Sequence, residues 1–307
     1  MLELSISTSK SRQGSVFAKV SFSLLLSSLA LSSAGFAQIS SAARSLYQAH
    51  QDSLVVVTAQ VTVKFETKEG SLPDQKQTAQ TLGTIVDKRG LVVLSNSAID
   101  LSLGMAGQRG RATGSDAFVE VTKATTVFDA IQVNLADSTV YHAARLDARP
   151  DLDLAFLMLD EGELQRRAGP LPALDLGKNV EGVSIGEQVI GLARASSVYA
   201  YIPTVVPLSI SAISKREPTY YITTVGAAQG MPVFNLAGNF VGLTVQKIVE
   251  NRPTGVLGVL EAKAVTQRVM LAKMKHKSLR DSDAPSPPEK PASKTSEKGS
   301  SKTSGRK

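Results

Sequence analysis

Few residues of the types that most often perform chemistry occur in this chain of 307 residues. It has no cysteine, which excludes a disulfide framework, a thiolate nucleophile and a zinc–thiolate site. Acid–base chemistry at neutral pH would therefore depend on three histidines, His50, His142 and His276. They are too widely spaced for a histidine-pair metal motif, and no phosphate-binding glycine loop or EF-hand loop is present. The sequence predicts no cofactor and no metal ion.

The net charge of +7 is concentrated at the two ends of the chain. Residues 1–37 carry three basic residues and one acidic residue, and residues 273–307 carry ten Lys or Arg and four Asp or Glu. The segment between them is close to neutral. Because a nucleic-acid-binding domain needs basic residues on its folded surface, we expect no nucleic-acid partner.

The first 37 residues have the pattern of a secretory signal peptide. A basic stretch ends at Lys19, an apolar run rich in Leu, Ala and Ser follows from Val20 to Ala37, and small residues precede a cleavage site after Ala37. The expected location of the mature chain is periplasmic or secreted. The alternative is an uncleaved membrane anchor. No later segment reaches ~20 continuous apolar residues.

The elements that must position any site are short strands separated by turns. After a helical lead-in at residues 38–52, apolar runs recur with few long helical patterns between them, which favours antiparallel barrels. The expected strands are Leu54–Val63, Leu82–Val86, Leu91–Leu94, Ile131–Leu135, Val140–Leu146, Val189–Leu192, Thr204–Ile213, Tyr220–Thr224, Met231–Phe234 and Phe240–Val249. The clearest helix runs from Glu261 to Lys277, with Ala262, Val265, Val269 and Ala272 on one face.

This length divides into two barrels, at residues 53–170 and at residues 171–277 with the closing helix. Residues 102–129 are rich in Gly, Ala and Thr, and we expect a long surface loop there. Residues 278–307 contain one large aliphatic side chain, Leu279, among Ser, Lys, Pro, Thr and Glu. Such a composition predicts a disordered basic tail, with weak contact to anionic surfaces.

Four segments together resemble trypsin-like serine proteases of the HtrA/Deg type. They are the hairpin at Leu82–Asp100, the Asp-Leu-Ala motif within Asp147–Leu157, the strand and turn at Gly230–Leu243, and the closing strand and helix from Gly255 to Val265. The match keeps one register from Leu54 to Leu271. The resemblance implies an all-β double barrel with a C-terminal helix, without a PDZ domain.

The same resemblance locates the catalytic positions and implies that they are degenerate. Ser97 stands at the histidine position and Gln229 at the serine position, and only Asp153 matches the triad. The mechanism needs a hydroxyl made nucleophilic by an imidazole, so we expect no catalytic residue. The segment from Ile222 to Pro232, which would form the oxyanion hole, is also shorter than in the family. The implied function is polypeptide binding by strand addition, without cleavage.

Other interpretations fit the same residues. An active serine endopeptidase with a displaced triad would need His50, His142 or His276 near Ser97. An envelope structural protein would use the basic tail on an anionic polymer or lipid. Whichever function holds, the simplest role for Ser97 and Gln229 is to fill the cleft, and for Asp153 to be a hydrogen-bonded structural carboxylate.

Overall fold

The fold was analysed in a computed structural model. It describes residues 38–283 except 70, 115, 178–181, 196, 225, 226 and 251. The expected signal peptide at residues 1–37 and residues 284–307 of the expected tail lie outside the described residues.

The N-terminal half forms a six-stranded antiparallel ring. Its strands are β1 (Leu54–Thr67), β2 (Gln75–Asp87), β3 (Leu91–Ser95), β5 (Phe118–Asn134), β6 (Val140–Arg149) and β7 (Leu154–Leu159). They follow the order β1-β2-β3-β7-β6-β5, and pairing between β1 and β5 completes the ring. A short strand, β4 (Arg109–Arg111), adds to the outer part of β5.

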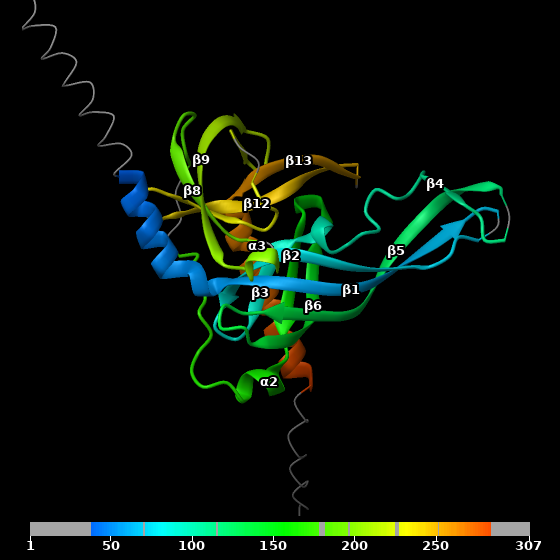
Figure 1. The fold of residues 1–307 in the computed structure, drawn as a ribbon, viewed down its shortest axis with the longest axis horizontal. Coiled ribbons are helices and arrows are strands. Elements are labelled where there is room, and N and C mark those ends of the chain that lie inside the picture. Colours follow the sequence, from blue (N-terminus) through cyan, green and yellow to red (C-terminus); the bar gives the residue numbers. More distant parts are fainter. Residues whose placement is uncertain are drawn as a thin grey trace, which may run out of the picture.

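The C-terminal half forms a closed six-stranded barrel, which lies above the first ring in Figure 1. Its strands are β8 (Gln188–Arg194), β9 (Pro203–Ser214), β10 (Tyr220–Thr223), β11 (Pro232–Asn235), β12 (Phe240–Val249) and β13 (Arg252–Glu261). Counted within each half, both rings have the strand order first, second, third, sixth, fifth, fourth. The expected all-β double barrel is confirmed.

Strands β3 and β7 form the wall between the two halves. Alternate residues of β3 pack in different clusters: Val92 and Leu94 lie in the core of the first ring, whereas Leu91 and Val93 pack with residues of the second barrel. Phe156 of β7 is fully buried in this shared cluster. Both strands are therefore apolar on both faces, which explains their continuous apolar sequences.

Helices flank the two rings. Residues 38–50 are helical, as expected for the lead-in, and pack Leu46 into the shared core beside the second barrel. A short helix, α2 (Glu161–Gln165), follows β7, and α3 (Ala262–Asp283) follows β13. The expected apolar face of α3 is confirmed, because Ala262, Val265, Val269 and Ala272 are all buried. No helix in the described part of the chain is long and apolar enough to cross a membrane.

Two expectations about loops and tails are corrected. Residues 102–129 are not simply a surface loop, because they contain β4 and the outer half of β5. The outer half of β5 pairs with β1 as far as Thr67, opposite Val121, and the two strands form an arm that extends away from both rings (Figure 1). The expected tail begins later than residue 278, because α3 continues to Asp283.

Candidate functional site

The strand ladder between β3 and β7 brings Ser97 and Asp153 together. Ser95, the last residue of β3, pairs with Leu154, the first residue of β7. Just beyond this end of the ladder, the backbone N–H of Asn96 donates to the carbonyl of Asp153 at 2.9 Å. Ser97 follows in a short 3-10 turn, Asn96–Ala98, so its position is set by the end of β3.

Gln229 comes from the second barrel. Its neighbour Gly230 packs closely against strand β2, and this contact places Gln229 beside Ser97. A Cβ atom on Gly230 would lie 2.2 Å from the carbonyl oxygen of Leu82, and its φ is 76°. Both observations require glycine at this position. The N–H of Gly230 also donates to the carbonyl of Thr244 at 2.8 Å, which holds the turn before β11 against β12.

The three residues expected at the triad positions lie in one hydrogen-bonded group. The side-chain amide of Gln229 donates to Ser97 Oγ at 3.1 Å. The backbone N–H of Ser97 donates to Asp153 Oδ1 at 2.6 Å. Asp153 is completely buried, whereas Ser97 and Gln229 are half-buried.

Two further residues complete the surroundings of Asp153. Ser95 Oγ donates to Asp153 Oδ2 at 2.5 Å, and the backbone N–H of Gln246 donates to the same oxygen at 2.6 Å. Sequence reasoning missed both residues. Ser95 lies two residues before Ser97 at a strand end, which is a usable signal for a neighbouring hydroxyl. Gln246 acts through its backbone, for which its side-chain type gives no signal.

The electrostatics of Asp153 follow from burial and neutral donors. Burial raises the pKa of its carboxyl group, and the hydrogen bonds from Ser95, Ser97 and Gln246 oppose this shift only in part. The residue adopts a left-handed conformation, with φ of 56° and ψ of 37°, which aspartate tolerates better than most residues. The arrangement holds a carboxylate in place without a partner cation among its hydrogen-bond donors.

None of the three histidines is a hydrogen-bond partner of Ser97 Oγ in the described part of the chain. The ring of His50 stacks on Phe234 of β11, with ring centroids 5.0 Å apart. His142 Nδ1 is 2.8 Å from Glu163 Oε1 on the exposed side of β6, and His276 lies on α3. Ser97 Oγ contacts the amide of Gln229 at 3.1 Å and the hydroxyl of Ser95 at 3.4 Å, and the Ser97 side chain also hydrogen-bonds the Asp153 carboxylate. None of these partners is an imidazole.

A groove of about 260 Å³ opens beside Gln229, between the two halves of the molecule. It is lined by Val56, Gln80, Thr81, Leu82, Arg194, Ala195, Tyr201, Ala228 and Gln229. Arg194 braces one wall, because its guanidinium donates to the carbonyls of Leu54, Tyr201 and Gln51 at 2.8, 2.9 and 3.1 Å. The groove is therefore formed by both rings and held open by a fixed side chain.

The edge of β2 along this groove is unpaired on one side. Residues 75–84 of β2 pair with β1, but among the described residues the pairing of β2 with β3 begins only at Gly83. The backbone at Gln80 and Thr81 thus has a free strand edge where it lines the groove, whereas at Leu82 the carbonyl oxygen is covered by Gly230. Such an edge can pair with an extended chain.

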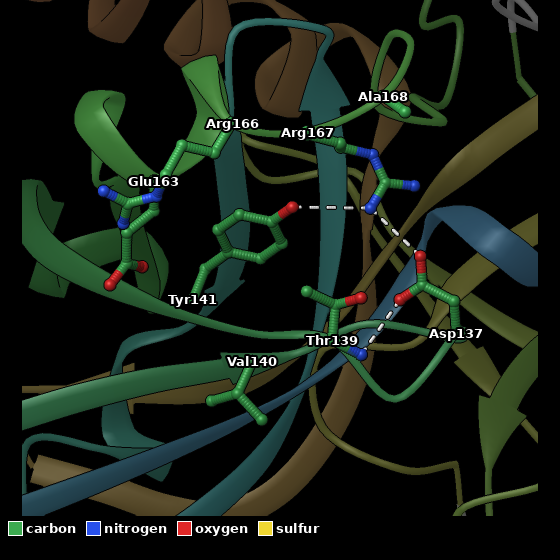
Figure 2. Close-up of a pocket in the computed structure, with 8 residues that line it drawn as sticks. All are labelled: Asp137, Thr139, Val140, Tyr141, Glu163, Arg166, Arg167 and Ala168. Carbon is green, nitrogen blue, oxygen red and sulfur yellow. Dashed lines mark hydrogen bonds and ion pairs between the residues drawn. The ribbon is translucent and has the colours of Figure 1, made fainter.

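A separate hollow of about 510 Å³ lies on the first ring, between the turn that joins β5 to β6 and the segment after α2 (Figure 2). Its polar groups bind one another: Arg167 Nη1 contacts Asp137 at 3.0 Å and the hydroxyl of Tyr141 at 3.5 Å. It contains none of the residues expected at the triad positions. For that reason we place the candidate site at the groove.

The chain matches no protein-family model and no curated protein. In the described part of the chain, no three His, Asp or Glu residues are grouped closely enough to hold a metal ion.

Proposed function

We propose that this chain is an exported double-barrel protein of the trypsin-like HtrA/Deg type that binds an extended polypeptide in the groove beside Gln229 and does not hydrolyse it. The contact between Gln229 and Ser97 carries the proposal. It joins the residues at the serine and histidine positions of the motif register, and neither supplies the chemistry that those positions require.

The fold supports the trypsin-like part of the proposal. Two six-stranded rings repeat one strand order, and the three motif positions come from both of them. Ser97 and Asp153 belong to the first ring and Gln229 to the second, which is the distribution that the motif resemblance predicts. Export is supported by the signal-peptide pattern that ends at Ala37.

Absence of hydrolysis follows from the partners of Ser97. A serine hydroxyl is a weak nucleophile until a base removes its proton. Here the hydroxyl accepts a hydrogen bond from the Gln229 amide, which cannot take a proton at neutral pH. The carboxylate of Asp153 binds the backbone N–H and the side chain of Ser97 and the hydroxyl of Ser95, so it stabilises the turn, but no imidazole relays a proton between the two residues.

Polypeptide binding is supported by the groove and the free edge of β2. An added strand gains main-chain hydrogen bonds at Gln80 and Thr81, and the groove offers room for a side chain against Ala228 and Tyr201. Recognition of this kind depends little on ligand sequence, because the backbone supplies much of the affinity. The ligand class we propose is an unfolded or extended segment of another protein.

The binding test uses fluorescein-labelled, unfolded casein and fluorescence anisotropy. We expect saturable binding, and an affinity about tenfold or more lower in Ala228→Trp, whose indole would fill the groove. Ala237→Trp is the matched control, since Ala237 is an exposed residue of the turn between β11 and β12. Equal binding by both variants would exclude the groove as the ligand site.

The same mixtures of chain and casein also distinguish a binding protein from an active serine endopeptidase with a displaced triad. Casein should remain intact on gels after prolonged incubation, and a fluorophosphonate probe should not label the chain. Cleavage and labelling that both disappear in Ser97→Ala would establish a displaced catalytic arrangement and refute the pseudoprotease proposal.

A further inference from the structure

Helix α3 has a second apolar face that packing against the barrels does not require. Met270, Leu271 and Met274 are 59%, 51% and 68% exposed. At about 100° per residue, these side chains point to the side of the helix opposite its buried face. They form one contiguous patch, because Met274 lies one turn after Met270 and Leu271. A surface helix normally has polar residues on its outer side.

Lysines surround this apolar patch. Lys263 and Lys277 are exposed at its two ends, and Lys275 is exposed at its flank, where it forms an ion pair with Asp147. We call the exposed residues Lys263, Gln267, Met270, Leu271, Met274, Lys275, Lys277 and Ser278 the outer face of α3. Over its whole length, Ala262–Asp283, the helix contains six Lys or Arg and two Asp, and both aspartates lie in its last turn, after the apolar patch.

We propose that the outer face of α3 binds the surface of an anionic lipid bilayer, with the helix lying parallel to it. In that orientation Met270, Leu271 and Met274 enter the boundary between headgroups and acyl chains, while the lysine side chains extend to the lipid phosphates. Apolar residues on one face with cations around them are the pattern of an interfacial helix.

Charge favours a lipid surface over a second copy of the chain. A two-fold contact through the outer face would bring Lys263 and Lys277 of both copies into one interface without an acidic residue of this face to pair with them. An anionic bilayer instead supplies many negative charges that adapt to the positions of the lysines. Residues 284–307 add six Lys or Arg and two Glu, so the charge of the following chain acts in the same direction.

This surface is separate from the polypeptide groove, and the inference does not depend on the proposed function. The groove is formed by β1, β2 and the turns next to β8 and β11, whereas the outer face of α3 contributes none of its lining residues. An exported protein could thus hold a polypeptide and a membrane surface at the same time.

The absence of tryptophan provides a reporter without background. The chain starting at Gln38, the proposed product of signal cleavage, would carry Met274→Trp or, as a control, Val198→Trp. Val198 is an apolar residue far from α3 in the sequence and is even more exposed than Met274, at 84% against 68%. Each is mixed with vesicles of phosphatidylglycerol and phosphatidylcholine, or of phosphatidylcholine alone. We expect a blue shift of the emission only for Met274→Trp with the anionic vesicles.

Sedimentation with the same vesicles measures the affinity. Replacing Lys263 and Lys277 by Gln should weaken binding about 25-fold at low salt, because each lysine near an anionic surface is worth about fivefold. Replacing Met270, Leu271 and Met274 by Gln, which keeps helix propensity, should weaken it tenfold or more. The same changes at Val198, Tyr199 and Ile202 serve as the matched control and should have no effect.

Several results would overturn the proposal. One is a triple Gln variant of the outer face that keeps its thermal melting curve and binds anionic vesicles as well as the unchanged chain does. Another is loss of all binding on deletion of residues 284–307 alone, which would assign the contact to the tail. A change from dimer to monomer in the triple variant, measured by analytical ultracentrifugation, would instead identify the outer face as a contact between copies.

Discussion

The buried carboxylate of Asp153 offers the sharpest test of how the site is built. Asp153 accepts hydrogen bonds from the backbone N–H groups of Ser97 and Gln246 and from the hydroxyl of Ser95, at 2.5 to 2.6 Å. These donors come from two segments, the end of β3 with its following turn and strand β12, and meet on one side chain. We compare Asp153→Asn, which keeps one oxygen acceptor, with Asp153→Leu, which keeps none.

The expected magnitudes follow from the number of donors left unpaired. In Asp153→Leu, two buried N–H groups lose their acceptor at about 1–3 kcal/mol each, whereas the Ser95 hydroxyl can rotate toward Ser97 Oγ, 3.4 Å away. The left-handed conformation of residue 153 adds about 1 kcal/mol for a leucine. Together these effects predict a loss of about 3–7 kcal/mol in the free energy of unfolding.

The substitution Asp153→Asn should change the free energy of unfolding much less than Asp153→Leu does. Asparagine tolerates the left-handed conformation and removes the buried charge, whose desolvation raises the pKa of Asp153, but it leaves one donor without an acceptor. These effects offset each other, so we expect a change within about 1 kcal/mol.

Guanidinium chloride melts followed by circular dichroism measure both variants. If Asp153→Leu were as stable as the unchanged chain, the hydrogen-bonded group at this site would be absent in solution.

The pH dependence of the free energy of unfolding gives a second check. Because the folded pKa of Asp153 lies above 3.8, the folded chain holds more protons than the unfolded chain between these two values. Acidification through that window should therefore stabilise the unchanged chain relative to Asp153→Asn.

Two further predictions test the contact between Ser97 and Gln229 and the packing of α3 against the first ring. The double variant Ser97→His with Gln229→Ser should remain without peptide hydrolysis and without fluorophosphonate labelling. The resemblance to trypsin-like proteases implies that the segment Ile222–Pro232 is too short to form the oxyanion hole, where one donor is worth ~3 kcal/mol. Robust hydrolysis would contradict this explanation. Burial raises the pKa of Asp87, but hydrogen bonds from Arg89 and Lys273 outweigh it and lower the pKa to about 2. Asp87→Asn should thus cost about 1–2 kcal/mol at pH 7, and chemical denaturation should show this cost disappearing as the pH falls from about 4 to about 2.

The strands could be predicted because their apolar runs are interrupted by turns with clear chemistry. The hairpin between β2 and β3 is an example: Asp87 accepts the N–H of Gly90 at 3.0 Å, and Gly90 has a φ of 95°. The juxtaposition of Ser97, Asp153 and Gln229 was predicted from the motif register and not from periodicity. Residues 132 positions apart, such as Ser97 and Gln229, meet only through the complete fold.

The arm shows where local sequence reasoning fails. The outer half of β5 alternates exposed residues with half-buried ones, and Val121 is the one buried residue of 118–129, so its apolar alternation is weak. Its strand conformation depends on pairing with β1, about 60 residues earlier, and on Val and Thr side chains that suit an extended backbone. The extension of α3 beyond residue 278 was missed for a related reason, because composition describes the tendency of a segment to fold alone and not its continuation of a packed helix.

The surroundings of Asp153 also explain why a matching aspartate is weak support for catalysis. Its donors are two backbone N–H groups and a serine hydroxyl at a strand end, and all three would need an acceptor whether or not a histidine stood at position 97. The carboxylate therefore has a structural role that is independent of any proton transfer. Ser97 and Gln229 are half-buried at the groove and satisfy each other, so they are the positions at which chemistry would be gained or lost at little cost to the fold. Activity is better judged from these two residues than from the aspartate between the rings.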